Sequence, residues 1–190
     1  MLSGQLMELA ERLEGERILL SALAVEDAPF LFERCWSSPA VMRYQDFPLH
    51  QALHDSVGRI HYLRQQWHAG LEYNFALQVK GYGVAGTFRC RPGARDTRLA
   101  FGFSLAEALW GRGYMAEALA LMQRQVLETT RGPVPGVAVC HHANRNAAAL
   151  LRRSGFVCAG SFHASGSFPN LAGETLACID RYEVHWEYWE

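Results

Sequence analysis

The sequence lacks the features that would place the protein in a membrane, outside the cell or on a nucleic acid. No apolar run approaches the ~20 residues that a transmembrane helix needs, and the N-terminus shows no signal-peptide pattern. The formal net charge is −1, so no excess of positive charge favours nucleic acid or an anionic membrane surface as a partner. The five cysteines are odd in number and have no CxxC spacing, which argues against a disulfide framework. These absences favour a cytoplasmic protein whose thiols stay reduced.

Nothing in the sequence divides it into separate units. It has no long linker and no internal repeat, and its 190 residues are 49% apolar, which suffices for one sizeable core. We therefore expect a single domain over residues 1–190. Leu6, Leu9 and Leu13 lie on one side of a predicted helix over residues 3–14. Residues 1–15 are thus expected to form a helical extension, which is a candidate element for a homodimer.

The order of apolar runs and turn residues predicts an α/β fold with a mixed sheet. Strands are expected over residues 18–23, 73–80, 84–90, 99–105, 137–141, 156–162 and 179–186. Helices are expected over residues 3–14, 26–36, 49–69 and 144–154, and from residue 113 onward. Glycines and prolines at 132–136 predict a loop, and glycines and serines at 163–173 predict a flexible one.

The most informative stretch is residues 110–115, which read Trp-Gly-Arg-Gly-Tyr-Met. They follow a predicted strand and open a predicted helix. A glycine-rich turn in that position leaves backbone N–H groups unpaired and aims them at one point, where the helix dipole also favours negative charge. Gly111 and Gly113 allow the backbone to approach an anion closely, and Arg112 adds a charge that pairs with phosphate. The turn predicts a site for a diphosphate, although alone it is equally compatible with a tight connection that binds nothing.

Three parts of the chain together resemble one known family. The first part comprises residues 16–20, which read Glu-Arg-Ile-Leu-Leu, residues 25–28, which read Val-Glu-Asp-Ala, and residues 38–44, which read Ser-Pro-Ala-Val-Met-Arg-Tyr. Residues 101–105 read Phe-Gly-Phe-Ser-Leu ahead of the glycine turn, and residues 144–156 end in Leu-Leu-Arg-Arg-Ser-Gly-Phe. In order and spacing they resemble the GNAT superfamily of acetyl-CoA-dependent N-acetyltransferases, and more narrowly its branch of ribosomal-protein N-terminal acetyltransferases of the RimJ/RimL type. The resemblance implies a single-domain GNAT acyl-CoA N-acyltransferase fold, whose mixed, mostly antiparallel central sheet is flanked by helices.

The resemblance also implies roles for individual residues. In the family, the strand before the glycine turn binds pantetheine through its backbone, and the turn holds the pyrophosphate. The residues implied to bind acetyl-CoA are Phe103, Ser104, Leu105, Gly111, Arg112, Gly113, Tyr114, Met115, Ala116 and Asn144. Ser104 and Asn144 are implied in catalysis, because a backbone N–H near Ser104 or Leu105 supports the oxyanion and Asn144 lies near the thioester. The acetyl group then passes directly to a primary amine, on a protein N-terminus or a small molecule, without a metal.

Two residues depart from the family pattern. Ala100 stands where many relatives have a glutamate that helps to deprotonate the amine, and Ala147 stands where a serine often protonates the leaving thiolate. A thiol with a pKa near ~8.5 leaves tolerably without an acid, and water can relay the amine proton. Glu107, Glu72 and the histidines are replacement bases that the sequence does not rank. The departures also leave open a non-catalytic acyl-CoA-binding module.

Four histidines share one stripe of the helix predicted over residues 49–69. They are His50, His54, His61 and His68. His50 and His54 have the spacing of metal ligands, but no carboxylate or cysteine motif completes a set, so we expect no metal. Otherwise the four histidines line the cleft for the acceptor substrate, or they lie on a solvent-exposed side of the helix.

Other polar residues near the predicted site have a functional and a structural interpretation. His141 or His142 is a candidate general acid or base, or polar filling at a strand end. Arg145, Arg152 and Arg153 are candidates for binding the 3′-phosphate of coenzyme A, or are solvated side chains of a helix.

Residues 81–86 match the dinucleotide fingerprint GxGxxG. That fingerprint needs a helix to follow it, whereas residues 84–90 favour a strand. We therefore expect a hairpin turn here and no nucleotide site.

Overall fold

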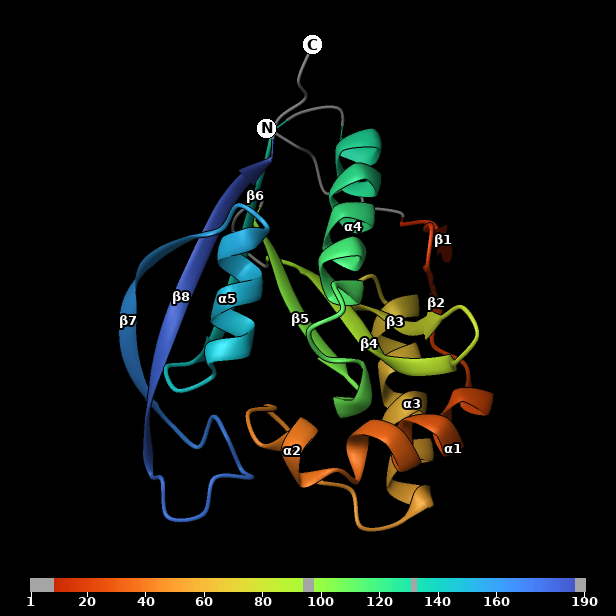
Figure 1. Cartoon of the computed structure of the whole chain (residues 1–190), viewed down its shortest axis with the longest axis horizontal. Helices are drawn as coiled ribbons and strands as arrows, with labels where there is room; N and C mark the ends of the chain where they lie inside the picture. The colour runs from red at the N-terminus through yellow and green to blue at the C-terminus, as the bar shows by residue number, and fades with distance from the viewer. Residues whose placement is uncertain (1–8, 94–97, 131–132, 187–190) are drawn as a thin grey trace.

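The computed structural model describes residues 9–93, 98–130 and 133–186 of the chain, which form an eight-stranded sheet flanked by helices (Figure 1). The strands are β1 (Arg12–Glu14), β2 (Ile18–Ala22), β3 (Tyr73–Val79), β4 (Gly83–Pro92), β5 (Leu99–Leu105), β6 (Val134–His141), β7 (Val157–Ser165) and β8 (Leu176–Trp186). The helices are α1 (Ala28–Leu31), α2 (Pro39–Met42), α3 (Leu53–His68), α4 (Tyr114–Thr130) and α5 (Arg145–Arg153), with short helical turns η1 (Val25–Asp27), η2 (Phe32–Trp36) and η3 (Glu107–Leu109). The predicted α/β class is confirmed. Within the described part of the chain, no helix combines the length and apolar character needed to span a membrane.

The sheet follows the order β1-β2-β3-β4-β5-β6-β8-β7, and each pairing except that of β5 with β6 is antiparallel. The mixed, mostly antiparallel sheet is therefore confirmed. The parallel pairing spans only residues 99–101 of β5 against residues 136–138 of β6. Beyond it the strands diverge, because β5 continues along β4 as far as Leu105 whereas β6 continues along β8 as far as His141. The divergence opens the middle of the sheet on one side of β5.

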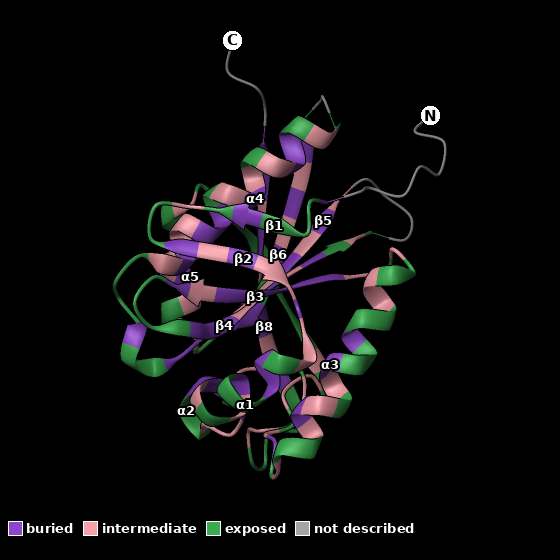
Figure 2. Ribbon diagram, turned by 90° about the vertical axis from the view of Figure 1, so that its right-hand side faces the viewer, coloured by how far each residue is buried: buried purple, intermediate pink, exposed green. Residues whose placement is uncertain are grey.

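Helices cover both faces of the sheet. Helices α4 and α5 lie in front of it in Figure 1, α3 lies behind it, and α1 and α2 lie below it; Figure 2 shows the layers from the side. Strand β3 is buried along nearly its whole length because helices cover both of its faces, whereas β7, at the edge, is almost entirely exposed. The predicted apolar face of α4 is buried, through Met115, Ala118, Leu119, Met122 and Val126.

The N-terminal helix was predicted wrongly over the residues that the structure describes. Arg12–Glu14 form β1, which pairs with β2. The amide of Gly15 donates to the carbonyl of Ile18 over 2.8 Å, which closes a tight hairpin between the two strands. Leu13 is buried between two exposed neighbours, as expected for a strand with one covered face. Residues 1–8 of the predicted extension lie outside the described residues.

Most other differences concern the ends of elements. Strand β6 begins at Val134, so Pro135 and Gly136, predicted in a loop, lie within it. Glycine suits position 136 in the sheet because a Cβ there would lie too close, at 2.9 Å, to the side chains of both Phe101 and Val184. Strand β7 extends to Ser165, into the loop predicted over residues 163–173.

The helix predicted over residues 26–36 is divided into η1, α1 and η2. Leu31 and Cys35 face inward as predicted, whereas Phe30 is 44% exposed and lies under the guanidinium of Arg34. Helix α3 begins at Leu53, and the side chain of that residue is 42% exposed rather than part of the core.

The predicted hairpin around residues 81–86 is confirmed, with β4 rather than a helix after the turn. Its last glycine has a structural role. A Cβ on Gly86 would collide with the carbonyl oxygen of Ser104 and lie 3.0 Å from the Cα of Leu105 on the adjacent strand. Gly86 therefore permits close packing of β4 against the part of β5 that has lost β6 as a neighbour.

We expect Gly86→Ala to lower the free energy of unfolding by about 1–3 kcal/mol, because the added methyl group must push apart two backbones. Urea-induced unfolding of both proteins measures this difference. Gly58→Ala is the matched control, because a Cβ at Gly58, inside α3, meets nothing within 4 Å. Alanine there should raise the stability by about 0.5–1 kcal/mol. Equal effects of the two substitutions would contradict the close packing at Gly86.

Candidate active site

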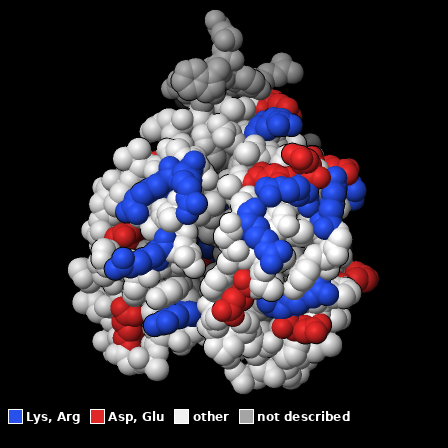
Figure 3. Space-filling model, viewed as in Figure 1, with Lys and Arg blue, Asp and Glu red and all other residues white. Residues whose placement is uncertain are grey.

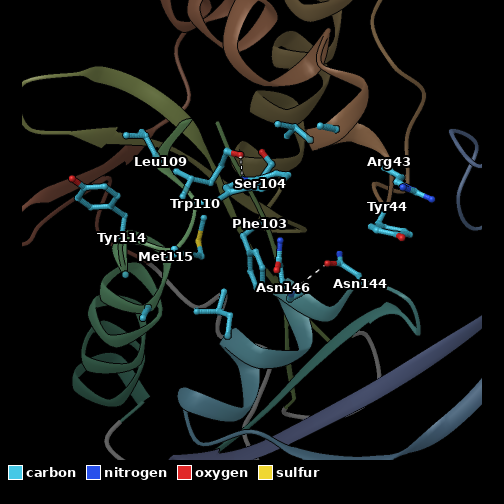
Figure 4. Close-up of a pocket in the computed structure, with 18 of the residues that line it drawn as sticks. Arg43, Tyr44, Phe103, Ser104, Leu109, Trp110, Tyr114, Met115, Asn144 and Asn146 are labelled. Carbon is cyan, nitrogen blue, oxygen red and sulfur yellow. Dashed lines mark hydrogen bonds between the residues drawn. The ribbon is translucent and has the colours of Figure 1, made fainter. Parts of the chain in front are cut away.

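A cavity of about 710 Å³ lies where β5 and β6 diverge (Figure 4). Its walls are formed by α2 and the chain after it, the end of β5, η3 and the turn before α4, the first turn of α4, and one side of α5 along its whole length. The cavity thus joins segments far apart in the sequence.

Nine of the ten residues predicted to bind acetyl-CoA line this cavity: Phe103, Ser104, Leu105, Gly111, Gly113, Tyr114, Met115, Ala116 and Asn144. The exception is Arg112, an exposed residue whose carbonyl oxygen accepts a hydrogen bond from Arg17. The structure therefore brings the strand, the glycine turn and the asparagine together in one place.

The glycine turn presents backbone amides to the cavity. Gly111 and Gly113 have φ angles of +74° and +80°, which other residues adopt only with strain. The amide of Glu117 donates to the carbonyl of Gly113, forming the first turn of α4. The amides of residues 114–116 precede that bond and have no partner within the helix. This helix end can bind an anion through its main chain.

The end of β5 directs part of its backbone into the opening of the sheet. The amide of Ala106 donates to a carbonyl of β4, and backbone groups alternate in direction along a strand. The backbone N–H and C=O groups of Phe103 and Leu105 therefore point away from β4. Their carbonyl oxygens accept hydrogen bonds from the side chains of Gln45 (3.2 Å) and Trp110 (2.7 Å). The amides of the same two residues face the cavity side, and Trp110 fastens the turn to the strand.

Arg17 supports the glycine turn, a role that the sequence reasoning missed. Its Nε and its backbone amide donate to the carboxylate of Glu117 over 2.9 and 2.8 Å, and its Nη1 donates to the carbonyl of Arg112 over 3.0 Å. Its guanidinium also lies over the ring of Tyr114. In the sequence, only its place in the segment that resembles the family indicates a role for Arg17, because the residues that it contacts lie about 100 positions further along the chain.

Ser104 and Asn144 use their side chains in local hydrogen bonds. The hydroxyl of Ser104 is 2.8 Å from that of Thr87 on β4. Asn144 caps α5, where its Oδ1 accepts from the amide of Ala147 over 3.2 Å. Asn146 also lines the cavity (Figure 4), and sequence reasoning missed it because it has no special spacing.

The histidine stripe is not a continuous surface. His50 is buried against Trp36, and its Nδ1 is 2.8 Å from the hydroxyl of Ser56. His54, His61 and His68 are exposed, and none of the four lines the cavity. Neither the metal nor the cleft interpretation of this stripe finds support.

The other candidate bases already have partners or lie in solvent. His141 stacks on Tyr44, and its Nε2 is 2.9 Å from Glu174. Glu72 accepts a hydrogen bond from Asn74 over 2.8 Å. Glu107 is exposed in η3.

Positive charge surrounds the cavity. Among the described residues that line it, Arg43 and Arg153 are the charged side chains, and there is no carboxylate or imidazole. Figure 3 shows Lys and Arg on both sides of the central hollow of this face. Of the three arginines predicted near the 3′-phosphate, Arg153 lines the cavity, whereas Arg152 lies over the ring of Tyr182. The cavity suits an anionic ligand.

The pair between Arg17 and Glu117 should stabilise the fold in a pH-dependent way. Burial alone raises the pKa of Glu117, but hydrogen bonds from the amide and guanidinium of Arg17 outweigh it, so the pKa lies below its usual value. The stability from this pair is therefore complete above the unfolded-state pKa and is lost as the pH falls through the lowered folded-state value.

We expect Glu117→Gln to lower the free energy of unfolding by about 1 kcal/mol at pH 7, because half of the Arg17 side chain is in solvent. The deficit should shrink below about pH 4. Urea unfolding at several pH values measures it, and Glu128→Gln, at an exposed position of α4, is the control. A deficit independent of pH would contradict the ion pair.

Comparisons with known proteins agree with this architecture. A search of curated proteins found no match. Among solved structures, the chain is similar to RimL, a ribosomal-protein α-N-acetyltransferase in complex with coenzyme A, with 17% identity, a TM-score of 0.75 and coverage of 92% of this chain and 97% of that one. It is also similar to an acetyltransferase from Salmonella typhimurium that modifies the N-terminal serine of a 50S ribosomal subunit protein, with 15% identity, a TM-score of 0.77 and coverage of 90% and 95%.

A third similar structure is the microcin self-immunity acetyltransferase MccE in complex with acetyl-CoA and AMP, with 15% identity, a TM-score of 0.78 and coverage of 90% of this chain and 93% of that one. At these identities the similarity concerns the fold. The family itself is shown by the sequence model of the acetyltransferase (GNAT) domain, which matches residues 17–157 and includes β5, the glycine turn and Asn144. The chain therefore belongs to the GNAT acetyltransferase family.

Proposed function

We propose that this protein transfers the acetyl group of acetyl-CoA directly to the α-amino group of an acceptor, on a peptide N-terminus or on an amino-acid-like small molecule. The observation that carries the proposal is the single cavity that contains both the open amides of the glycine turn and the free edge of β5. Membership of the GNAT family supports acetyl transfer. Acetyl-CoA as donor is supported by similar structures that hold coenzyme A or acetyl-CoA.

The walls of the cavity suggest how the donor lies. Its diphosphate accepts hydrogen bonds from the amides of residues 111–116, at a helix N-terminus that favours negative charge. Its pantetheine arm extends along the edge of β5, where β6 has moved away, and accepts a hydrogen bond from the amide of Phe103. Arg153 is placed to meet the 3′-phosphate.

The reaction then needs few side chains. The neutral amine nitrogen attacks the thioester carbonyl carbon, and the amide of Leu105, which faces the cavity, stabilises the oxyanion. The attack forms the C–N bond; the nitrogen then gives up a proton to water, and collapse of the intermediate breaks the C–S bond and leaves the amide. The coenzyme A thiolate leaves and takes up a proton from water, since Ala147, which also lines the cavity, cannot supply one. Asn144 and Asn146 supply polar groups to the same cavity.

The acceptor reaches the thioester from the side of Arg43. A second hollow of about 530 Å³ shares Ala40 and Arg43 with the cavity and is lined further by residues 170–172 and Glu174. The carboxylate of Glu174 is held by His141. This hollow is open enough to admit a peptide end or a small molecule.

The charges of the cavity favour an α-amine as acceptor. Among the described residues no carboxylate or imidazole lines the cavity itself, and Glu174 of the second hollow is already paired with His141. Arg43 and Arg153 disfavour an ammonium ion at the thioester. The acceptor must therefore lose its proton to water. At pH 7 an α-amine, with a pKa of about 8, is neutral two to three orders of magnitude more often than an alkylamine with a pKa of about 10.4.

A panel of acceptors tests the proposed function. With acetyl-CoA and a thiol-release assay, we expect peptides with a free N-terminal α-amine to react roughly 100-fold faster at pH 7 than Nα-acetylated lysine peptides or polyamines. The rate with the α-amine should rise with pH, reach half of its maximum near pH 8 and level off above about pH 9. Faster transfer to the alkylamines would contradict the α-amine assignment. Tight binding of acetyl-CoA without thiol release for any acceptor would instead show a non-catalytic binding module.

The substitution Gly113→Glu tests the placement of the diphosphate. A carboxylate in the turn would repel the phosphates, and a side chain at φ +80° strains the turn, so we expect at least a 100-fold loss of affinity for coenzyme A in a calorimetric titration. The matched control is Gly81→Glu, which has the same φ angle in the β3–β4 hairpin, outside the cavity. If Gly113→Glu bound coenzyme A as tightly as Gly81→Glu does, the diphosphate would not lie at this turn.

A further inference from the structure

A second group of reactive side chains lies outside the acetyl-transfer cavity, at one end of β6 and β8. His142 directly follows β6, and Cys178 and Asp180 lie two residues apart on β8, so their side chains share one face of the sheet. One nitrogen, sulfur or oxygen atom from each of the three residues lies within 4.8 Å of the other two. None of the three lines the cavity.

We propose that His142, Cys178 and Asp180 bind a divalent transition-metal ion, and that Zn²⁺ fits them best. An imidazole nitrogen, a thiolate and a carboxylate are the three ligand types that Zn²⁺ takes from proteins. Zn²⁺ bonds of about 2.0–2.3 Å place tetrahedral ligand atoms roughly 3.3–3.8 Å apart. Nδ1 of His142 is already 3.1 Å from both carboxylate oxygens of Asp180. Closing around the ion therefore requires movements of about 1 Å.

The surroundings hold these ligands in position. The amide of His142 donates to the carbonyl of Cys178 over 2.9 Å, which fixes the backbones that carry two of the ligands. The hydroxyl of Ser161 donates to Oδ1 of Asp180 over 2.6 Å. The carboxylate is thus oriented by a second residue, as is common for metal ligands.

A candidate fourth ligand lies on the neighbouring strand, outside the three residues whose ligand atoms are within 4.8 Å of one another. His163 of β7 is directly opposite Cys178 of β8 in the antiparallel register, so both side chains are on the same face. Its addition makes a set of two imidazoles, one thiolate and one carboxylate, which satisfies tetrahedral coordination. The ion would then tie β7 and β8 to the loop after β6, two residues before Asn144.

Metal titration of the reduced, chelator-treated protein tests the proposal. We expect about one Zn²⁺ per chain by calorimetry. Co²⁺ in place of Zn²⁺ should give a thiolate-to-metal absorption band in the near ultraviolet. Cys178→Ser should weaken Zn²⁺ binding at least tenfold and abolish the band. Its unfolding curve without metal, if close to that of the wild type, shows that the loss is not a loss of fold.

Two matched variants control for adventitious binding. Cys158→Ser changes an exposed thiol on β7 that is not in the cluster, and His54→Asn changes an exposed imidazole on α3. Both should bind Zn²⁺ like the wild type, whereas His142→Asn should bind it at least tenfold more weakly. Equal affinity of the wild type and Cys178→Ser would overturn the site. An unchanged affinity in His163→Asn would remove that residue from the ligand set.

Discussion

The divergence of β5 from β6 is the constraint on which the rest of the site depends. The two strands pair over only three residues each, and then each follows a different antiparallel partner. A strand that loses its neighbour must satisfy its backbone groups elsewhere. Here Gln45 and Trp110 take two of the carbonyl oxygens, and the amides remain for a ligand with amide groups of its own. One irregularity in the sheet therefore creates both the cavity and its binding edge.

The glycine turn works only because distant parts of the chain hold it. Trp110 ties the turn to the end of β5, and Arg17 ties it to the hairpin of β1 and β2. Both contacts leave the amides at the start of α4 open to the cavity. The guanidinium of Arg17 lies 3.5 Å from where a Cβ on Gly113 would be, so it also adds positive charge beside the turn. The N-terminal hairpin is thereby part of the site, although it lies far from it in sequence.

Local sequence patterns predicted those parts of the site whose residues are neighbours in the sequence. The turn at residues 110–116 could be predicted because glycines, a preceding strand and a helical apolar pattern lie next to one another. Arg17 could not, because its partners lie about 100 positions away and no pattern encodes that distance. The helix predicted over residues 3–14 was wrong over its described residues 9–14, because leucine spacing was weighed without the tight turn at Gly15, which pairs Arg12–Glu14 with β2. His50 shares a helical spacing with His54, but packing against Trp36 buries it and separates it from that stripe.

A crystal structure of the protein with bound acetyl-CoA tests the account most directly. The account predicts the diphosphate on the backbone amides of residues 111–116, and the pantetheine arm along Phe103 and Leu105 where β6 has moved away. The thioester carbonyl should lie within hydrogen-bond distance of the Leu105 amide. A donor bound outside this opening, or one whose diphosphate contacts side chains but none of these amides, would contradict the account.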